Sequence, residues 1–166
     1  ASSIVAYNGI GEFSYLDLQK ALTGKNFSLN PSISDHTEGM AGSSTVKDFE
    51  TMMQLTYLYF TAPRQDDQAF QSLMSMLETQ LAARDKNPKT AFQDSIAQTI
   101  ASHHPREVIV NLDFIKKVDQ QRAIALYKER FANPADFLVT FIGNINPNDE
   151  ATRQLICTWL GGLKTN

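Results

Sequence analysis

The sequence predicts an α+β fold, a small and mostly antiparallel sheet with helices packed on one face. Three observations lead to this prediction: a run with period-two hydrophobicity, several runs at helical spacing, and the order of these runs. The order is helix, hairpin, several helices, strand and helix. It differs from the regular alternation of strands and helices that builds a parallel sheet.

The period-two run covers residues 27–34, where apolar residues and Pro31 alternate with serine and asparagine. This alternation predicts a half-buried strand, and the proline places it at an edge or a bulge. The short, glycine-containing stretch 37–44 then predicts a partner strand. Residues 35 and 36 would form the tip of the hairpin.

Helices are predicted where apolar residues recur at spacings of three and four after a capping residue. Ser14 followed by Asp17 resembles a capping box, and that run stops at Gly24. Further helices are expected to begin near Thr45, Asp66, Asn87, Asp119 and Asn146.

The stretch 136–144, "DFLVTFIGN", predicts the best strand of the chain. It is apolar on both faces, which is typical of a central strand. Cys157 lies between apolar residues of the last predicted helix, and we expect it in the core rather than acting as a nucleophile.

The bulk properties fit one domain over residues 1–166, and the start of the chain reads as cut from a longer protein. A net charge of -3 and a pI near 5.6 argue against nucleic acid and anionic membranes as partners. No apolar run reaches the roughly 20 residues of a membrane span. One cysteine fits the periplasm, which we favour, and the cytoplasm alike.

Asp35, His36 and Glu38 are three metal-binding residue types within four positions. Neighbouring side chains of an extended strand point to opposite faces, so we expect a solvated turn rather than a metal site. His103 and His104 are also adjacent, and Pro105 favours a loop at the end of a helix.

No zinc-binding helix motif occurs in the chain, and the residues by themselves predict no catalytic or metal site. A weaker hypothesis is an independent metal site that uses His36, His103 and His104. Arg106, in the same polar loop, is expected to stabilise that loop rather than to contact substrate.

Three stretches resemble the pitrilysin (insulinase-type) family of zinc metallopeptidases over essentially the whole chain: "GKNFSLNPSISDHTEGMAGSS", "MMQLTYLYFTAPR" and "LYKERFANPADFLVTFIGNI". The resemblance points to the first domain of the family's non-catalytic C-terminal half. It implies a clamshell of two halves around a peptide chamber, with zinc in the other half on a His-x-x-Glu-His helix and a downstream Glu.

Residues 5–9, "VAYNG", resemble the segment that follows the zinc helix in catalytic halves. By this alignment Ser3 replaces the general-base Glu, Ile4 replaces the second His, and Gln80 replaces the downstream Glu, with Glu78 nearby but out of phase. These side chains cannot hold a catalytic zinc and activate its water.

The resemblance therefore implies a domain without catalytic or metal-binding residues of its own, which closes the chamber of a bacterial zinc endopeptidase. Its partners would be the catalytic half of the same protein and peptide substrates, and zinc would be bound in that other half. The alternative is a non-proteolytic assembly or binding subunit of the same fold, like the core proteins of respiratory complexes.

Overall fold

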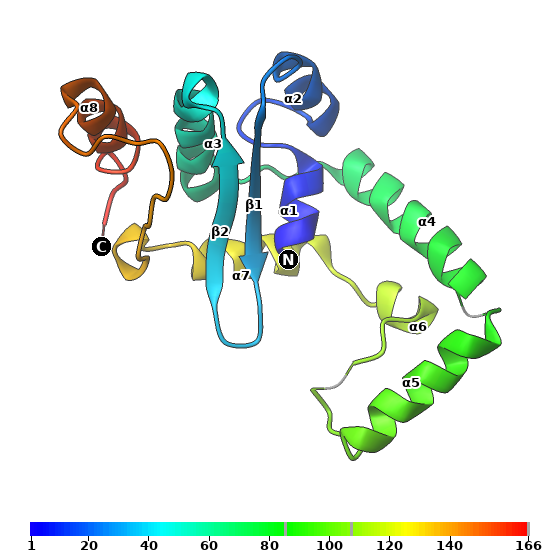
Figure 1. Cartoon of the computed structure of the whole chain (residues 1–166). Helices are drawn as coiled ribbons and strands as arrows, with labels where there is room; N and C mark the ends of the chain where they lie inside the picture. The colour runs from blue at the N-terminus through cyan, green and yellow to red at the C-terminus, as the bar shows by residue number, and fades with distance from the viewer. Residues whose placement is uncertain (85, 107, 166) are drawn as a thin grey trace. The chain divides into compact units, whose positions relative to one another are not determined.

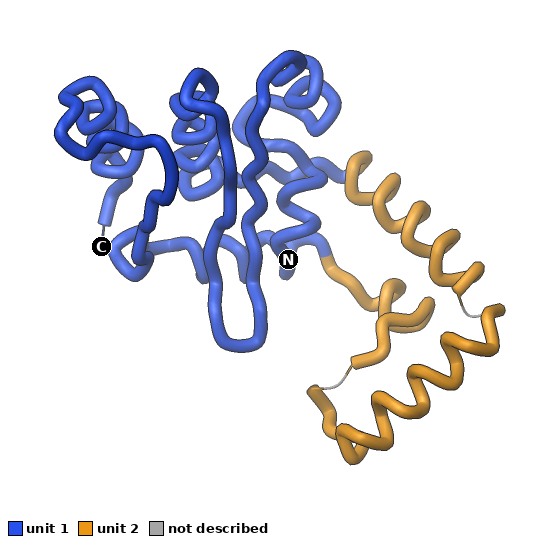
Figure 2. The backbone as a smooth tube through the Cα atoms, in the orientation of Figure 1, with its two compact units in different colours: residues 1–67, 120–166 blue, residues 68–119 orange. Residues whose placement is uncertain are grey.

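The computed structural model describes residues 1–84, 86–106 and 108–165. The chain consists of two compact units (Figures 1 and 2), one formed by residues 1–67 and 120–166 and the other by residues 68–119. The expectation of one domain over residues 1–166 stays a prediction. The α+β fold class is confirmed, since helices surround a small antiparallel sheet.

The sheet of the first unit is the predicted hairpin. Strand β1 (Phe27–Ile33) pairs with β2 (Glu38–Ser44), with Phe27 opposite Ser44 and Ile33 opposite Glu38. Burial alternates along β1 as its sequence predicts, and the apolar side chains contact the core. The turn is closed by the Ser34 amide, which donates to the Thr37 carbonyl at 2.8 Å.

The helices of the first unit lie around this hairpin (Figure 1). Their bounds are α1 Ser2–Asn8, α2 Tyr15–Ala21, η1 Val46–Asp48, α3 Phe49–Thr61, α7 Gln120–Arg130, η2 Pro134–Asp136 and α8 Glu150–Trp159. Most begin where the sequence indicates: the Ser14 hydroxyl accepts from the Asp17 amide to cap α2, and the Thr45 hydroxyl caps η1. The last helix begins three residues after the predicted start, because Asp149 supplies its cap.

The core of the first unit is formed mainly by residues of α1, α3 and α7, and apolar residues of β1 pack against it. Val5, Ile10, Tyr127 and Phe131 are at most 2% exposed, and further apolar residues of β1 and α3 pack against them. The Tyr127 hydroxyl donates to the Tyr59 carbonyl at 3.2 Å, which satisfies this buried group. Burial raises the pKa of the Tyr127 phenol, so it stays protonated.

The second unit is helical, with α4 (Asp67–Arg84) leading into it, α5 (Pro88–Ile100) and α6 (Leu112–Ile115). The Asn87 side chain caps α5 as predicted, and Arg84 Nη2 donates to both carboxylate oxygens of Asp94, at 2.6 and 2.8 Å. Within the described residues no helix is both long and apolar enough to cross a membrane.

The predicted central strand at residues 136–144 is wrong for this structure. Residues 134–136 form η2, and the segment after it is irregular and extended. Leu138 and Ile142 are each 93% exposed. The segment lacks a hydrogen-bonded partner strand among the described residues, and a strand needs one.

The expectation that Cys157 lies in the core is also wrong, because its side chain is exposed on α8. Leu155, Ile156 and Trp159 of the same helix are only half-buried. The helix contacts α3 on one side, and Trp159 meets Tyr57 edge to face with ring centroids 5.8 Å apart. Cys157 faces away from the apolar stripe that makes this contact.

Candidate functional site

The positions that resemble the zinc helix lie on α1. Ile4 is 7% exposed and faces the protein interior next to Val5, whereas the Ser3 side chain is exposed. An isoleucine offers no donor atom, and a serine hydroxyl is not a ligand of catalytic zinc sites. The side chains of this helix therefore do not fit a zinc ion, and the helix contributes packing to the core instead.

Gln80, at the position of the family's downstream Glu, lies exposed on α4, and Glu78 lies on the same helix. Ser3 and Ile4 belong to the first unit and Gln80 to the second. The assignment of these three residues as degenerate counterparts of zinc-site positions stays a prediction.

His36 lies in the turn of the hairpin. Asp35 and His36 are exposed between β1 and β2, and Glu38 opens β2 with an exposed side chain. Hydrogen bonds between Ser34 and Thr37 hold the turn, so neither Asp35 nor His36 is needed to form it. The interpretation of this stretch as a solvated turn agrees with this geometry.

His103 and His104 lie just after the C-terminal end of α5 in the second unit. Ser102 and His103 have φ angles of 52° and 53°, and the His103 amide donates to the Gln98 carbonyl at 2.8 Å. This left-handed turn closes the helix, and histidine tolerates it better than most side chains. His104 Nδ1 accepts from the Arg106 amide at 3.2 Å, so His104 has a local structural role.

No group of three or more histidine, cysteine, aspartate or glutamate side chains is placed to hold a metal ion within residues 1–84, 86–106 and 108–165. The independent metal site that uses His36, His103 and His104 stays a prediction, because His36 belongs to the first unit and the other two residues belong to the second.

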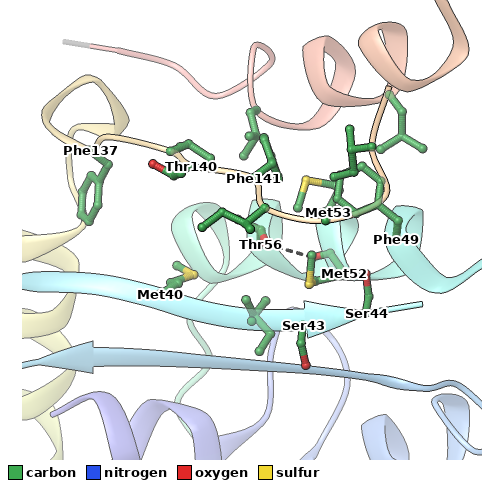
Figure 3. Close-up of a pocket in the computed structure, with 18 of the residues that line it drawn as sticks. Met40, Ser43, Ser44, Phe49, Met52, Met53, Thr56, Phe137, Thr140 and Phe141 are labelled. Carbon is green, nitrogen blue, oxygen red and sulfur yellow. Dashed lines mark hydrogen bonds between the residues drawn. The ribbon is translucent and has the colours of Figure 1, made fainter. Parts of the chain in front are cut away.

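The first unit contains a groove of about 850 Å³ that the sequence alone did not predict (Figure 3). Its floor is α3, one wall is β2, and the other wall is the extended segment after η2, with α8 at one end. The apolar lining includes Met40, Phe49, Met52, Met53, Phe60, Phe137, Phe141, Leu155 and Leu160.

Aromatic and hydrogen-bond contacts fix the walls of this groove. Phe49 of α3 and Phe141 of the extended segment meet edge to face, with ring centroids 5.6 Å apart. Phe137 packs against Phe60 and Phe131 at 5.1 and 5.3 Å, which attaches the start of the segment to the core. The Thr56 hydroxyl donates to the Met52 carbonyl at 2.8 Å, which removes a polar group from the floor.

Both walls present unused backbone groups. Within the described chain, β2 pairs only with β1, so its other edge is free of a partner strand. Residues 138–142 form no backbone hydrogen bond with any described residue. A groove whose lining combines apolar residues with polar ones, such as Glu38, Thr45 and Glu50, thus lies between two extended segments whose edges are unpaired among the described residues. This arrangement is suited to hold an extended polypeptide.

Asp48 anchors the end of the groove where β2 passes into α3. Its Oδ2 accepts from the Asn26 amide and the Thr45 hydroxyl, each at 2.9 Å, and Lys25 Nζ lies 3.6 Å from Oδ1. These hydrogen bonds, with the Asn26 amide contributing most, lower the pKa of Asp48 below its usual value. At the other end, Thr152 lowers the pKa of Asp149, which caps α8.

No family model matches the sequence. A protein of Arabidopsis thaliana described as zinc protease PQQL-like is 28% identical over 119 residues, which is 70% of this chain and 12% of that protein. This chain therefore corresponds to a small part of that relative.

The periplasmic protease PqqL from Escherichia coli has a similar crystal structure. It matches over 99% of this chain and 18% of its own, with a TM-score of 0.74 and 21% sequence identity. The pitrilysin-family resemblance is confirmed. The α+β fold is shared across the whole chain, and at this identity the match establishes the fold alone.

The crystal structure of a mutant of the ferredoxin protease FusC, in complex with Arabidopsis ferredoxin, matches less closely. It covers 78% of this chain and 14% of its own, with a TM-score of 0.61 and 16% identity. All three similar proteins are proteases or protease-like by name, and each is several times longer than this chain. The chain is thus similar in sequence to part of a zinc protease-like protein and similar in fold to parts of two proteases.

Proposed function

We propose that this chain is a non-catalytic domain of a bacterial zinc metalloendopeptidase, which helps to form and close the chamber where peptides are hydrolysed. The observation that carries the proposal is the match to PqqL, which covers 99% of this chain but 18% of that protease. A segment of this size has the role of one domain in a longer protein. Hydrolysis of peptide bonds would be the activity of that whole protein.

The side-chain inventory supports a role through shape rather than chemistry. Ser3, Ile4 and Gln80 stand where the resemblance places a base and two zinc ligands, and none can replace a histidine or a carboxylate at zinc. The catalytic half of the same polypeptide would bind zinc and supply the glutamate that activates water. This domain would pair with that half and limit the size of the peptides admitted.

The proposal is tested with the 166-residue chain and the full-length protein side by side. We expect the chain to leave casein and a fluorogenic peptide uncleaved, with or without zinc, and the full-length protein to cleave both until a chelator removes its metal. Calorimetric titration of zinc into the chain should show no stoichiometric binding. Hydrolysis by the isolated chain would contradict the proposal.

A triple variant tests whether the chain lacks a zinc site altogether or has lost one only through these three replacements. Ser3→Glu, Ile4→His and Gln80→Glu together restore the residue types that the resemblance assigns. We expect the triple variant of the isolated chain to remain inactive, because a zinc ion also needs the first histidine of the motif. Activity in this variant would show that the chain carries a complete site.

The alternative, a non-proteolytic assembly subunit, rests on the same fold and makes a different prediction. Its full-length protein would lack an intact His-x-x-Glu-His helix and would show no chelator-sensitive peptidase activity. The names of the similar proteins favour the protease.

A further inference from the structure

The second unit, drawn in orange in Figure 2, lacks the kind of core that holds the first. Among its described residues the buried apolar side chains are Leu73, Leu81 and Ile115. Helix α5 buries none of its residues. A unit of about 50 residues is close to the size at which a single hydrophobic core stops being sufficient for stability. Polar contacts therefore carry a large share of the stability of this unit.

The placement of side chains on α5 explains why its core is so small. Phe92, Ile96 and Ile100 recur at a spacing of four, so they share one face of the helix, and all three are exposed. Asp94 lies on the opposite face, because each residue advances by about 100° around the helix axis. This helix thus turns a carboxylate toward α4, where it meets Arg84, and leaves its apolar stripe in solvent.

Arg84 connects the two longer helices of the second unit. Its Nη2 atom donates to both carboxylate oxygens of Asp94, and its Nη1 atom donates to the Val110 carbonyl at 3.5 Å. The side chains of Arg84 and Asp94 are 32% and 27% exposed, so the pair is partly shielded from water. Shielding and charge-assisted hydrogen bonds make such a pair stronger than an ion pair on the open surface.

The first unit is held by packing instead. Among the described residues, the extensive contacts between elements all lie in this unit, for example between α3 and the hairpin, between α1 and α7, and between α3 and α8. Val5, Ile10 and Tyr127 are fully buried at its centre. Regions with few buried apolar contacts unfold locally at a lower free energy than a packed core. The two units should therefore differ in local stability.

We propose that the second unit unfolds locally and cooperatively while the first unit stays folded, and that the Arg84–Asp94 pair is the contact that holds the second unit folded. Local unfolding here means that α4 and α5 lose their helical hydrogen bonds together with the contacts of Arg84. The inference concerns the 166-residue chain itself, so it goes beyond the proposed function and does not depend on it. It gives the domain a conformational device, a part of the fold that one ionic contact controls.

The position of the pair allows it to act on the whole unit. Arg84 is the last residue of α4 and Asp94 lies in the middle of α5, so their contact joins the end of one helix to the centre of the next. Asp94→Asn removes the negative charge from these two hydrogen bonds. The folded unit alone loses by this change, because both side chains are hydrated once the unit has unfolded.

Hydrogen exchange of the 166-residue chain, measured by mass spectrometry, tests the inference. We expect the amides of α4 and α5 to be protected, but to exchange about a hundredfold faster than those of α3 and α7. Asp94→Asn should accelerate the exchange of α4 and α5 by about a further tenfold, because it weakens the folded form of the unit. The exchange of α3 and α7 should stay unchanged in this variant.

Two further variants make the result specific to the pair. Lys89→Gln removes a charge from an exposed side chain of the same helix, and it should change the exchange of α4 and α5 by less than about twofold. Arg84→Gln should have the same effect as Asp94→Asn. The double variant should be no less protected than either single variant, because both substitutions remove one shared interaction.

Four outcomes would overturn the inference. Equal protection of the two units would show that they unfold together. Exchange of α4 and α5 at the rate of an unstructured chain in the wild type would show that the pair holds nothing folded. An effect of Lys89→Gln as large as that of Asp94→Asn, or no effect of Asp94→Asn, would show that the pair does not control this unit.

Limited proteolysis provides an independent readout. Chymotrypsin cleaves after large apolar residues, and a site inside a helix is cut only when that helix unfolds. We expect cleavage after Leu77 and Phe92, inside α4 and α5, well before cleavage after Tyr57 inside α3. Asp94→Asn should accelerate cleavage at the first two sites by about tenfold and leave the third unchanged. A first cut within α3 would place the least stable part of the chain in the first unit and contradict the inference.

Discussion

The sequence predicts strands both in the hairpin and at residues 136–144, yet among these only the hairpin forms strands in the structure. Strand β1 is half polar and contains Pro31, whereas the later segment is mostly apolar and carries the β-branched residues Val139, Thr140 and Ile142. Strand β1 has its partner strand close by in the sequence, because Ile33 pairs with Glu38 across the turn from Ser34 to Thr37. The later segment has no partner in the described chain, so β-propensity alone does not produce a strand here.

The two regions also differ in what holds them. The apolar face of β1 packs on a core whose central residues are fully buried, and Asp48, directly before α3, accepts a hydrogen bond from the Asn26 amide, directly before β1. The later segment is attached at its start through Phe137 and at its middle through Phe141. Its remaining side chains lie in solvent. The following experiments test this contrast, from the largest expected effect to the smallest.

Replacement of the buried aromatic Phe131 should destabilise the first unit most. Its ring stacks on Tyr127 with centroids 4.4 Å apart and also contacts Phe60 and Phe137. We expect Phe131→Ala to lower the free energy of unfolding by about 3–5 kcal/mol, measured by urea denaturation with far-ultraviolet circular dichroism. The hairpin should unfold together with the helices.

The control for this variant is Phe92→Ala, which removes a phenyl ring that is 66% exposed on α5. It should change the free energy of unfolding by no more than about 0.5 kcal/mol. Equal losses for both variants would show that the core does not hold the first unit as described.

Two glycines of β2 test how closely the hairpin packs against its neighbours. A Cβ atom at Gly42 would lie 2.8 Å from the Ser28 carbonyl oxygen and 3.1 Å from Met52 Sδ, whereas one at Gly39 would meet nothing within 4 Å. We expect Gly42→Ala to cost about 1–3 kcal/mol in the free energy of unfolding, because the backbone of β1 must shift.

Gly39→Ala is the matched variant on the same strand. It should be neutral or stabilise the protein by about 0.4–1 kcal/mol, because alanine restricts the unfolded chain. The comparison uses urea midpoints of both variants. A Gly42→Ala midpoint equal to that of Gly39→Ala would mean that β2 is free to move away from β1.

Low pH should lower the free energy of unfolding because Asp48 becomes protonated. The pKa of its carboxyl group is lowered in the folded protein, so its stabilising effect is complete above the unfolded value of 3.8 and is lost as pH falls through the folded pKa. We expect the free energy of unfolding to fall below about pH 4 in the wild type and to fall less steeply in Asp48→Asn.

Asp149→Asn provides the comparison on the other side of the groove. The pKa of Asp149 is lowered in the same direction, but its partner is Thr152 of its own helix. Loss of this cap affects α8 locally, so its effect on the pH dependence of global unfolding should be smaller. A larger effect at Asp149 would place the main acid-sensitive contact outside the hairpin.

The sequence predicted those parts of the fold that are decided by short-range contacts. The caps at Ser14 and Asn87 each satisfy a helix amide two or three residues later, and the alternation along β1 is matched residue by residue in its burial. The short helix α6 was not predicted. Its four residues are too few to show a helical period, although Asn111 caps it.

The features that the sequence did not predict depend on distant partners. Cys157 is exposed because α8 contacts the rest of the unit along one side, which the neighbouring apolar residues do not reveal. The groove forms where β2, α3 and residues 136–145 meet, and these segments are up to about a hundred residues apart in the chain. The candidate zinc positions came from the family resemblance, because Ser3, Ile4 and Gln80 carry no signal of their own.

The smallest effect is expected from the exposed face of the extended segment, at Leu138 and Ile142. In the 166-residue chain both side chains lie in solvent, so Leu138→Ser combined with Ile142→Ser should change the free energy of unfolding by no more than about 0.5 kcal/mol. Urea denaturation of the chain with and without the double substitution measures this change. A substantial loss in the isolated chain would mean that these residues already pack within it, and the contrast between the hairpin and this segment would then fail.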